Sequence, residues 1–223
     1  MSDGAVMPRG NAVGEVTNNM VMRNSSSTDG RNRRAAETRR KVIDAAKAMI
    51  AETAVAPTVV GVAKRANVSV RSVFQHFRDV ESLFVTVVES AEKDVVVPPA
   101  TPSDLPLGER VESFARNMAQ IYEQIVSYRV AAGQFVGHPA LQARSQLIHG
   151  RLREAASRVF NREFGTLTLQ AREELADAIA ASLSLESWAA LRRLQNLGFE
   201  RAVATWQLTL GALLAHPMMP VAV

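Results

Sequence analysis

The chain has 223 residues, of which 47% are hydrophobic and 22% are charged, and it contains no cysteine. These proportions are typical of globular proteins and exclude collagen-like and wholly disordered chains. The lack of cysteine excludes disulfides, thiolate zinc sites and cysteine nucleophiles, and it favours a reducing compartment. Because no run of about 18 apolar residues and no secretory signal is present, we expect a cytoplasmic protein that neither spans a membrane nor is exported.

Positive charge is concentrated in one part of the chain. The formal net charge is +4, but residues 31–78 contain 11 Lys and Arg against 3 Asp and Glu, and the remaining residues contain 15 against 19. This asymmetry is typical of a module that binds a polyanion and is attached to a near-neutral body. A solvated basic face with no partner is the alternative that charge alone leaves open.

The first 30 residues have neither helical nor strand periodicity and include the polar run from Ser25 to Thr28. We therefore expect residues 1–34 to form a disordered tail, which ends in a basic arm made by Arg31, Arg33 and Arg34.

Three helices are predicted over residues 35–80. Apolar residues recur with helical spacing from Glu37 to Thr53, and two short helices are predicted at Val59–Arg65 and Val70–Phe77. Thr58 and Ser69 are suitable N-caps, and Asn67 tolerates a left-handed backbone in the turn between the short helices. Because helices of about seven residues do not persist alone in water, they must pack on the longer one, which gives a helix-turn-helix domain.

The rest of the chain is also predicted to be helical. We expect helices from Asp79 to Pro98, around Val111–Ile125, in a short piece around Arg129–Phe135, at Leu141–Phe160, at Gln170–Leu197 with Gly198 as its C-cap, and at Glu200–Ala215. The prediction is an all-α fold of about nine helices. Residues 81–217 would form a larger helical regulatory and dimerisation domain, and residues 218–223 a tail.

The segment from Thr38 to Glu89 resembles the tetracycline-repressor (TetR) family of bacterial transcription regulators. The matching residues have the spacing of that family's helix-turn-helix: Val42 to Met49, Thr58, Val62, Ala63, Ala66 to Ser69, Ser72 to Phe77, Glu81 and Leu83. Three positions depart from the family pattern. Val80 stands where a phosphate-contacting lysine is usual, Phe74 replaces a tyrosine, and Arg71 stands where glycine is common.

The outer face of the third helix is the candidate DNA-reading surface, because a helix fits the major groove of B-DNA when its exposed side chains reach bases or phosphates. The candidate DNA-binding residues are Thr58, Ser69, Val70, Arg71, Ser72, Phe74, Gln75, His76 and Arg78. Arg71 would pair with guanine and Gln75 with adenine, and the resemblance implies that Thr58, Phe74 and His76 lie near phosphates. The alternatives are a core position for Phe74 and a merely solvated surface for the others.

The last two predicted helices, residues 170–197 and 200–215, carry more apolar residues than one core needs, among them Trp188 and Trp206. The resemblance implies that they form a four-helix bundle with a second copy in a homodimer. The alternative is that both tryptophans belong to the core of a single chain.

The middle helices could enclose a cavity for a small apolar ligand, as the family commonly does. The candidate lining residues are Phe114, Met118, Tyr122, Phe135, His138 and Trp188. Ordinary core packing explains the same pattern. The chain contains no phosphate-binding glycine loop, nucleophile elbow or zinc-binding HExxH motif, so we expect no enzyme activity, no cofactor and no metal.

Together with these patterns, the resemblance to the TetR family implies a homodimeric regulator of transcription. We expect a repressor that binds palindromic double-stranded DNA and is released by a small molecule. The alternative is a helical protein-interaction scaffold whose helix-turn-helix does not read DNA.

Overall fold

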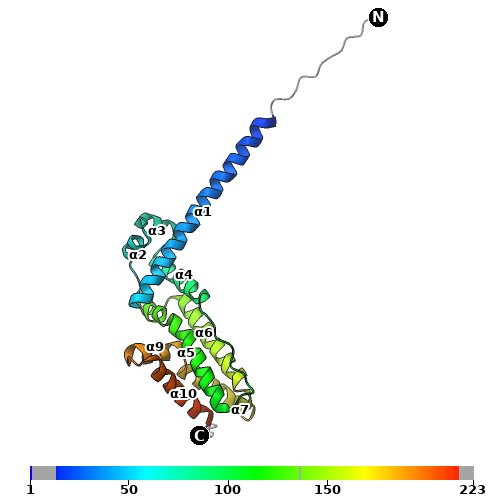
Figure 1. Cartoon of the computed structure of the whole chain (residues 1–223), viewed down its shortest axis with the longest axis vertical. Helices are drawn as coiled ribbons and strands as arrows, with labels where there is room; N and C mark the ends of the chain where they lie inside the picture. The colour runs from blue at the N-terminus through cyan, green and yellow to red at the C-terminus, as the bar shows by residue number, and fades with distance from the viewer. Residues whose placement is uncertain (2–13, 136, 216–223) are drawn as a thin grey trace.

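The computed structural model describes Met1, residues 14–135 and residues 137–215. Across these residues the secondary structure is helical and includes no strand, which confirms the predicted all-α fold (Figure 1). The elements in chain order are α1 Gly14–Thr53, α2 Val59–Ala66, α3 Val70–His76, α4 Val80–Lys93, α5 Leu107–Ala131, the 3-10 turn η1 Ala132–Phe135, α6 Pro139–Val159, α7 Asn161–Gly165, α8 Leu169–Ser182, α9 Leu185–Ala189, the π-helical turn η2 Ala190–Leu194 and α10 Phe199–Ala215.

Helices α1 to α4 share one core in the N-terminal part of the molecule. The side chains that fill it are all buried: Val42, Ala46, Ile50, Val62, Ala63, Val73, Phe77, Leu83, Phe84 and Val87. Burying an aliphatic or aromatic side chain of this size stabilises a fold by about 1.5 to 3 kcal/mol. The two short helices α2 and α3 therefore depend on α1 and α4 for their stability.

Helix α1 begins much earlier than the sequence predicts. It starts at Gly14 rather than near Glu37, so the predicted disordered tail is corrected over residues 14–34, where the basic arm is helical. The physical reason is that no proline occurs between Pro8 and Pro57. Once the packed part of α1 has formed, each further residue adds to an existing helix without a new nucleation step. Residues 2–13 and 216–223 lie outside the described residues, as does the predicted tail at 218–223.

Both tryptophans belong to the core of the single chain. Trp188 and Trp206 are 0% and 1% exposed, and their ring centroids lie 4.8 Å apart. Tyr122 on α5 meets the Trp206 ring edge-on at 5.9 Å. Most of the apolar side chains that suggested a partner surface are therefore packed between α5, α9 and α10 of the same chain.

The predicted long helix at Gln170–Leu197 is broken in the middle. Ser184 has an extended backbone, and its hydroxyl accepts a hydrogen bond from the Ser187 backbone N–H, which starts α9 as a new helix. Such local bonds compete with helix continuation. The left-handed residue near the end of this segment is Asn196, with φ 52°, and not the predicted Gly198.

Candidate nucleic-acid interface

Three short polar residues in the predicted places shape α2, α3 and the turn between them. The Thr58 hydroxyl accepts a hydrogen bond from Gly61 N–H at 3.1 Å, and the Ser69 hydroxyl accepts one from Ser72 N–H at 3.0 Å. Asn67 has φ 53° and ψ 48°, the left-handed conformation that this residue type tolerates. These contacts confirm both predicted N-caps and fix the direction in which α3 leaves α2.

Helix α2 is held against α1 by a close approach and by an ion pair. A Cβ atom at Gly61 would lie 3.0 Å from the Met49 methyl group and 3.2 Å from the Thr58 hydroxyl oxygen, so a side chain there would crowd the contact. Arg65 donates two hydrogen bonds to Glu52 at 2.7 and 2.6 Å. Arg65 is therefore engaged within the domain.

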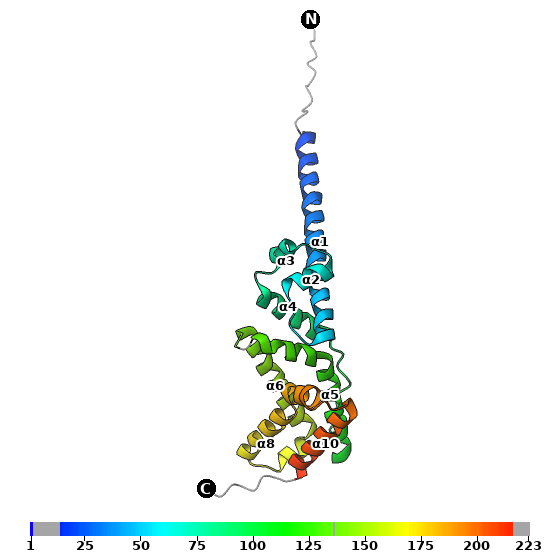
Figure 2. The same cartoon turned by 90° about the vertical axis from the view of Figure 1, so that its left-hand side faces the viewer.

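Helix α3 turns one side into the core and the other to solvent (Figure 2). Val73 is 1% exposed and Phe77, its C-cap, is 4% exposed. On the opposite side Phe74 is 51% exposed and Val70 38%, and Arg71 and Gln75 are exposed beside them. The alternative that Phe74 is a core residue is therefore wrong.

The remaining candidate residues surround this outer face. Ser69 and Ser72 share a hydroxyl hydrogen bond of 2.8 Å at the start of α3, and His76 is half-buried at its end. The side chain of Arg78 is 94% exposed and lies 3.9 Å from Asp79. Thr58 is exposed at the start of α2. Hydroxyl, imidazole and guanidinium groups thus border an outer face that also contains apolar side chains.

Val80, the first residue of α4, is half-buried and packs against the core. It lines a small cavity together with Ile50, Pro57 and Leu83. At the position where the family resemblance predicts a lysine, this chain therefore has a valine that packs against the core. Sequence reasoning missed Arg39, whose guanidinium carbon lies 5.2 Å from the centre of the Phe77 ring at the end of α3.

Residues 42–87 match the family model of bacterial regulatory proteins of the tetR family, and this segment spans the core of α1, both short helices and most of α4. These residues form a DNA-binding domain of the TetR family. The match supports a transcriptional regulator with a DNA-binding helix-turn-helix.

The whole fold is also similar to a solved structure. A candidate TetR-family transcriptional regulator from Mesorhizobium loti MAFF303099 superposes with a TM-score of 0.57 at 19% sequence identity, over 82% of this chain and 97% of that chain. At this identity the likeness establishes the shared fold. A search of curated proteins gave no significant match.

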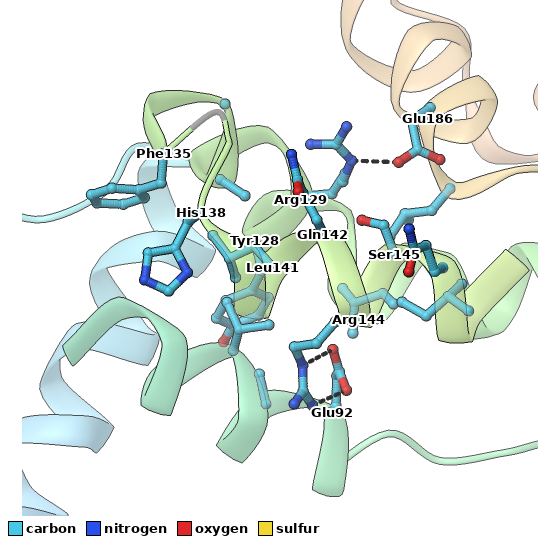
Figure 3. Close-up of a pocket in the computed structure, with 18 of the residues that line it drawn as sticks. Glu92, Tyr128, Arg129, Phe135, His138, Leu141, Gln142, Arg144, Ser145 and Glu186 are labelled. Atoms are coloured by element: carbon cyan, nitrogen blue, oxygen red, sulfur yellow. Dashed lines mark hydrogen bonds and ion pairs between the residues drawn. The ribbon is translucent and has the colours of Figure 1, made fainter. Parts of the chain in front are cut away.

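A second feature of the molecule is a cavity of about 530 Å³ between α4, α5, α6 and α9 (Figure 3). Its wall combines apolar residues such as Ile125 and Leu141 with polar ones such as Gln142 and Ser145. Charged residues are present in pairs. Arg129 donates to Glu186 at 2.7 Å, and Arg144 donates to Glu92 through two nitrogens. The cavity has the size of a small-molecule site.

Ion pairs shift the pKa values of two residues that line the cavity. Burial alone would raise the pKa of Glu186, but the hydrogen bond from Arg129, a backbone hydrogen bond and the positive charge of Arg129 together outweigh that effect, and the pKa lies below its ordinary value. The pKa of Arg144 is raised by its hydrogen bonds to Glu92. Glu186 and Arg144 are therefore charged at neutral pH.

Two of the six predicted pocket residues, Phe135 and His138, line this cavity. The other four lie elsewhere: Phe114 packs on Phe160, Tyr122 and Trp188 pack on Trp206, and Met118 packs against the core. Helical periodicity identifies a buried face but not the part of it that borders a void. The sequence did not indicate the charged lining residues. Arginines on a half-buried face of a helix recur with the same spacing as arginines on a solvated face.

No helix within the described ranges is long and apolar enough to cross a bilayer. Within the same residues no three His, Cys, Asp or Glu side chains gather in a way that could hold a metal ion.

Proposed function

We propose that this regulator is a homodimeric repressor that binds a palindromic operator through α3 and is released by a small molecule. The observation that carries the proposal is the outer face of α3. There Arg71 and Gln75 are exposed one helical turn apart on a helix whose opposite side is anchored by Val73 and Phe77. Its site of action would be the cytoplasm, where bacterial chromosomal DNA lies.

Each side chain of this face suits one class of DNA contact. Arg71 can donate two hydrogen bonds to guanine, and Gln75 can pair with adenine. Val70 and Phe74 offer apolar contact to thymine methyl groups or sugars. The candidates for phosphate contacts, which fix the register on the duplex, are Thr58, Ser69, Ser72, His76 and Arg78.

The dimer proposal rests on the outer face of α10. Four small or apolar residues there are all exposed at helical spacing: Ala204, Leu208, Ala212 and Ala215. Leu208 is 77% exposed. Small residues allow close helix packing, and an isologous pairing of α8 and α10 with their copies would give the two-fold symmetry that a palindromic operator requires.

The cavity supports a ligand that combines an apolar body with hydrogen-bonding groups. Ile125 and Leu141 suit the first part, and Gln142 and Ser145 the second. Since α4 both borders the cavity and packs on α1, a ligand that moves α4 would also move the DNA-binding helices. Within this proposal the protein acts by binding and not by catalysis.

The proposal is tested by selecting duplexes from a randomised DNA library with the full chain. We expect enrichment of a two-fold symmetric sequence whose affinity falls steeply with salt, with a log-log slope of about −0.9 per neutralised phosphate. Arg71→Ala should cost about 1 to 3 kcal/mol in binding and relax the preference at one base pair of each half-site. If no duplex is bound even at low salt, a protein-interaction scaffold becomes the better description.

A further inference from the structure

The part of α1 that precedes the helix-turn-helix is a strongly basic helix. Between residues 30 and 41 the chain carries six Lys or Arg residues against the single acidic residue Glu37. Figures 1 and 2 show α1 continuing well past α2 and α3, and no other described element lies beside that part of it. At about 1.5 Å per residue, the 25 residues of α1 ahead of Arg39 extend for about 37 Å.

Three of these arginines continue the buried side of α1. Eleven residues correspond to about three full helical turns, so residues 11 apart share a face. Arg31, Arg34 and Arg39 each precede a buried residue by 11 positions, namely Val42, Ala45 and Ile50. By contrast, Arg33 and Arg40 precede the exposed residues Asp44 and Ala51. The side that packs on the domain therefore continues as an exposed basic stripe of Arg31, Arg34 and Arg39.

The stripe leaves the domain on the side of α3. The Arg39 guanidinium lies over the ring of Phe77, the C-cap of α3, at 5.2 Å. Arg34 and Arg31 lie five and eight residues further out, or about 8 and 12 Å along the helix. The major groove is about 12 Å wide, so Arg34 and Arg31 extend far enough from α3 to reach a strand that flanks the groove.

We propose that this basic stripe of α1 is a second DNA-binding surface, which binds the phosphates that flank the groove occupied by α3. The guanidinium groups supply charge-assisted hydrogen bonds to phosphodiester oxygens, which add affinity without sequence preference. This contribution offsets the lysine and tyrosine hydroxyl that Val80 and Phe74 do not provide. The inference rests on the proposed function, because it requires DNA on α3.

The test compares two double variants of the full chain that remove equal charge from opposite faces of the same helix. Arg31→Ala with Arg34→Ala alters the stripe, and Arg33→Ala with Arg40→Ala is the matched control. Alanine and arginine are both good helix formers, so α1 should persist in both, and circular dichroism checks this. Binding to the selected operator is measured by fluorescence anisotropy over a salt series, with Arg71→Ala alongside.

Because the dimer carries the stripe twice, the stripe variant removes four arginines and should lose up to about 3.6 from the magnitude of the log-log salt slope, while its ratio of operator to random-sequence affinity stays unchanged. Its deficit relative to the parent should then shrink by up to about 150-fold between 50 and 200 mM salt. The control variant should retain the parent slope. An unchanged slope in the stripe variant, or an equal loss in both, overturns the inference while the proposed function stands if Arg71→Ala still alters preference. Failure of the parent chain to bind DNA overturns both.

Discussion

Arg144 on α6 joins Glu92 on α4 across the wall of the cavity. Its Nε donates to Glu92 Oε1 at 3.0 Å, and its Nη1 donates to Glu89 Oε1, one turn earlier on α4, at 3.2 Å. The other end of α4 packs Leu83 and Phe84 into the core of the DNA-binding helices. This arginine therefore connects the cavity to α4, a helix that packs on both α1 and α5.

Arg144→Ala should loosen α4 without unfolding the protein. Both side chains of the Arg144–Glu92 pair are about one quarter exposed, so its loss should cost about 1 kcal/mol and speed amide exchange in α4 roughly fivefold. Hydrogen exchange followed by mass spectrometry measures this. Arg153→Ala removes an arginine of the same helix that pairs with Glu173 on α8, and it should leave α4 exchange unchanged. Equal protection of α4 in both variants would refute the connection.

The buried Arg110 should be the most costly ion-pair residue to remove. Its guanidinium is 2% exposed, donates two hydrogen bonds of 2.7 Å to Glu163, and also donates to the carbonyls of Leu105 and Val159. Arg110→Ala leaves these acceptors without donors and should lower the free energy of unfolding by about 3 kcal/mol in urea. Arg116→Ala, which removes the exposed pair with Glu200, should cost less than about 1 kcal/mol.

The same pair predicts a pH dependence of stability. The Arg110 guanidinium lowers the pKa of the Glu163 carboxyl group. Its contribution is thus fully present above the ordinary glutamate pKa of about 4.3 and is lost as the pH falls through the lower folded value. Melting temperatures from about pH 6 to about pH 3 should therefore fall less steeply in Glu163→Gln than in the parent. Parallel curves would show that Glu163 has the same pKa in the folded and unfolded chains.

Leu208→Arg should convert the proposed dimer to a monomer. The substitution places a charge in the middle of the apolar outer face of α10, where a partner helix would bury it. Light scattering after gel filtration should give a mass about twice 24.2 kDa for the parent and about 24.2 kDa for the variant. Leu147→Arg, at a position on α6 that is 54% exposed, is the control and should remain dimeric. A monomeric parent at micromolar concentration would contradict the dimer.

Local signals in the sequence predicted the DNA-binding helices well, because short-range chemistry fixes them. Thr58, Asn67 and Ser69 each act within three residues of their own position, and all three behave as predicted. The family resemblance covers the same segment. The capping residues and the family resemblance are both most informative in this segment, where contacts between near neighbours fix the backbone.

Features that depend on distant contacts were less predictable. The Ser184 hydroxyl ends a helix whose apolar spacing alone suggests continuation, and Trp188 and Trp206 bury each other where their spacing also fits a partner surface. The helical residues ahead of Glu37 were not predicted because they lack apolar periodicity. Such periodicity indicates a helix that packs against a core, and a helix can form without it. The charged cavity residues could not be predicted from local spacing, because only the fold brings α4 and α6 together.

The central claim, that the outer face of α3 reads bases, is tested most directly by site-specific crosslinking. Since the chain contains no cysteine, Gln75→Cys gives a single attachment point for a photoactivatable group on α3, and Gln120→Cys gives a matched one on the exposed face of α5. On the selected operator, the label at position 75 should crosslink to bases within each half-site and the label at position 120 should not. An operator that binds with full affinity but crosslinks at neither position, or only at 120, would contradict the account.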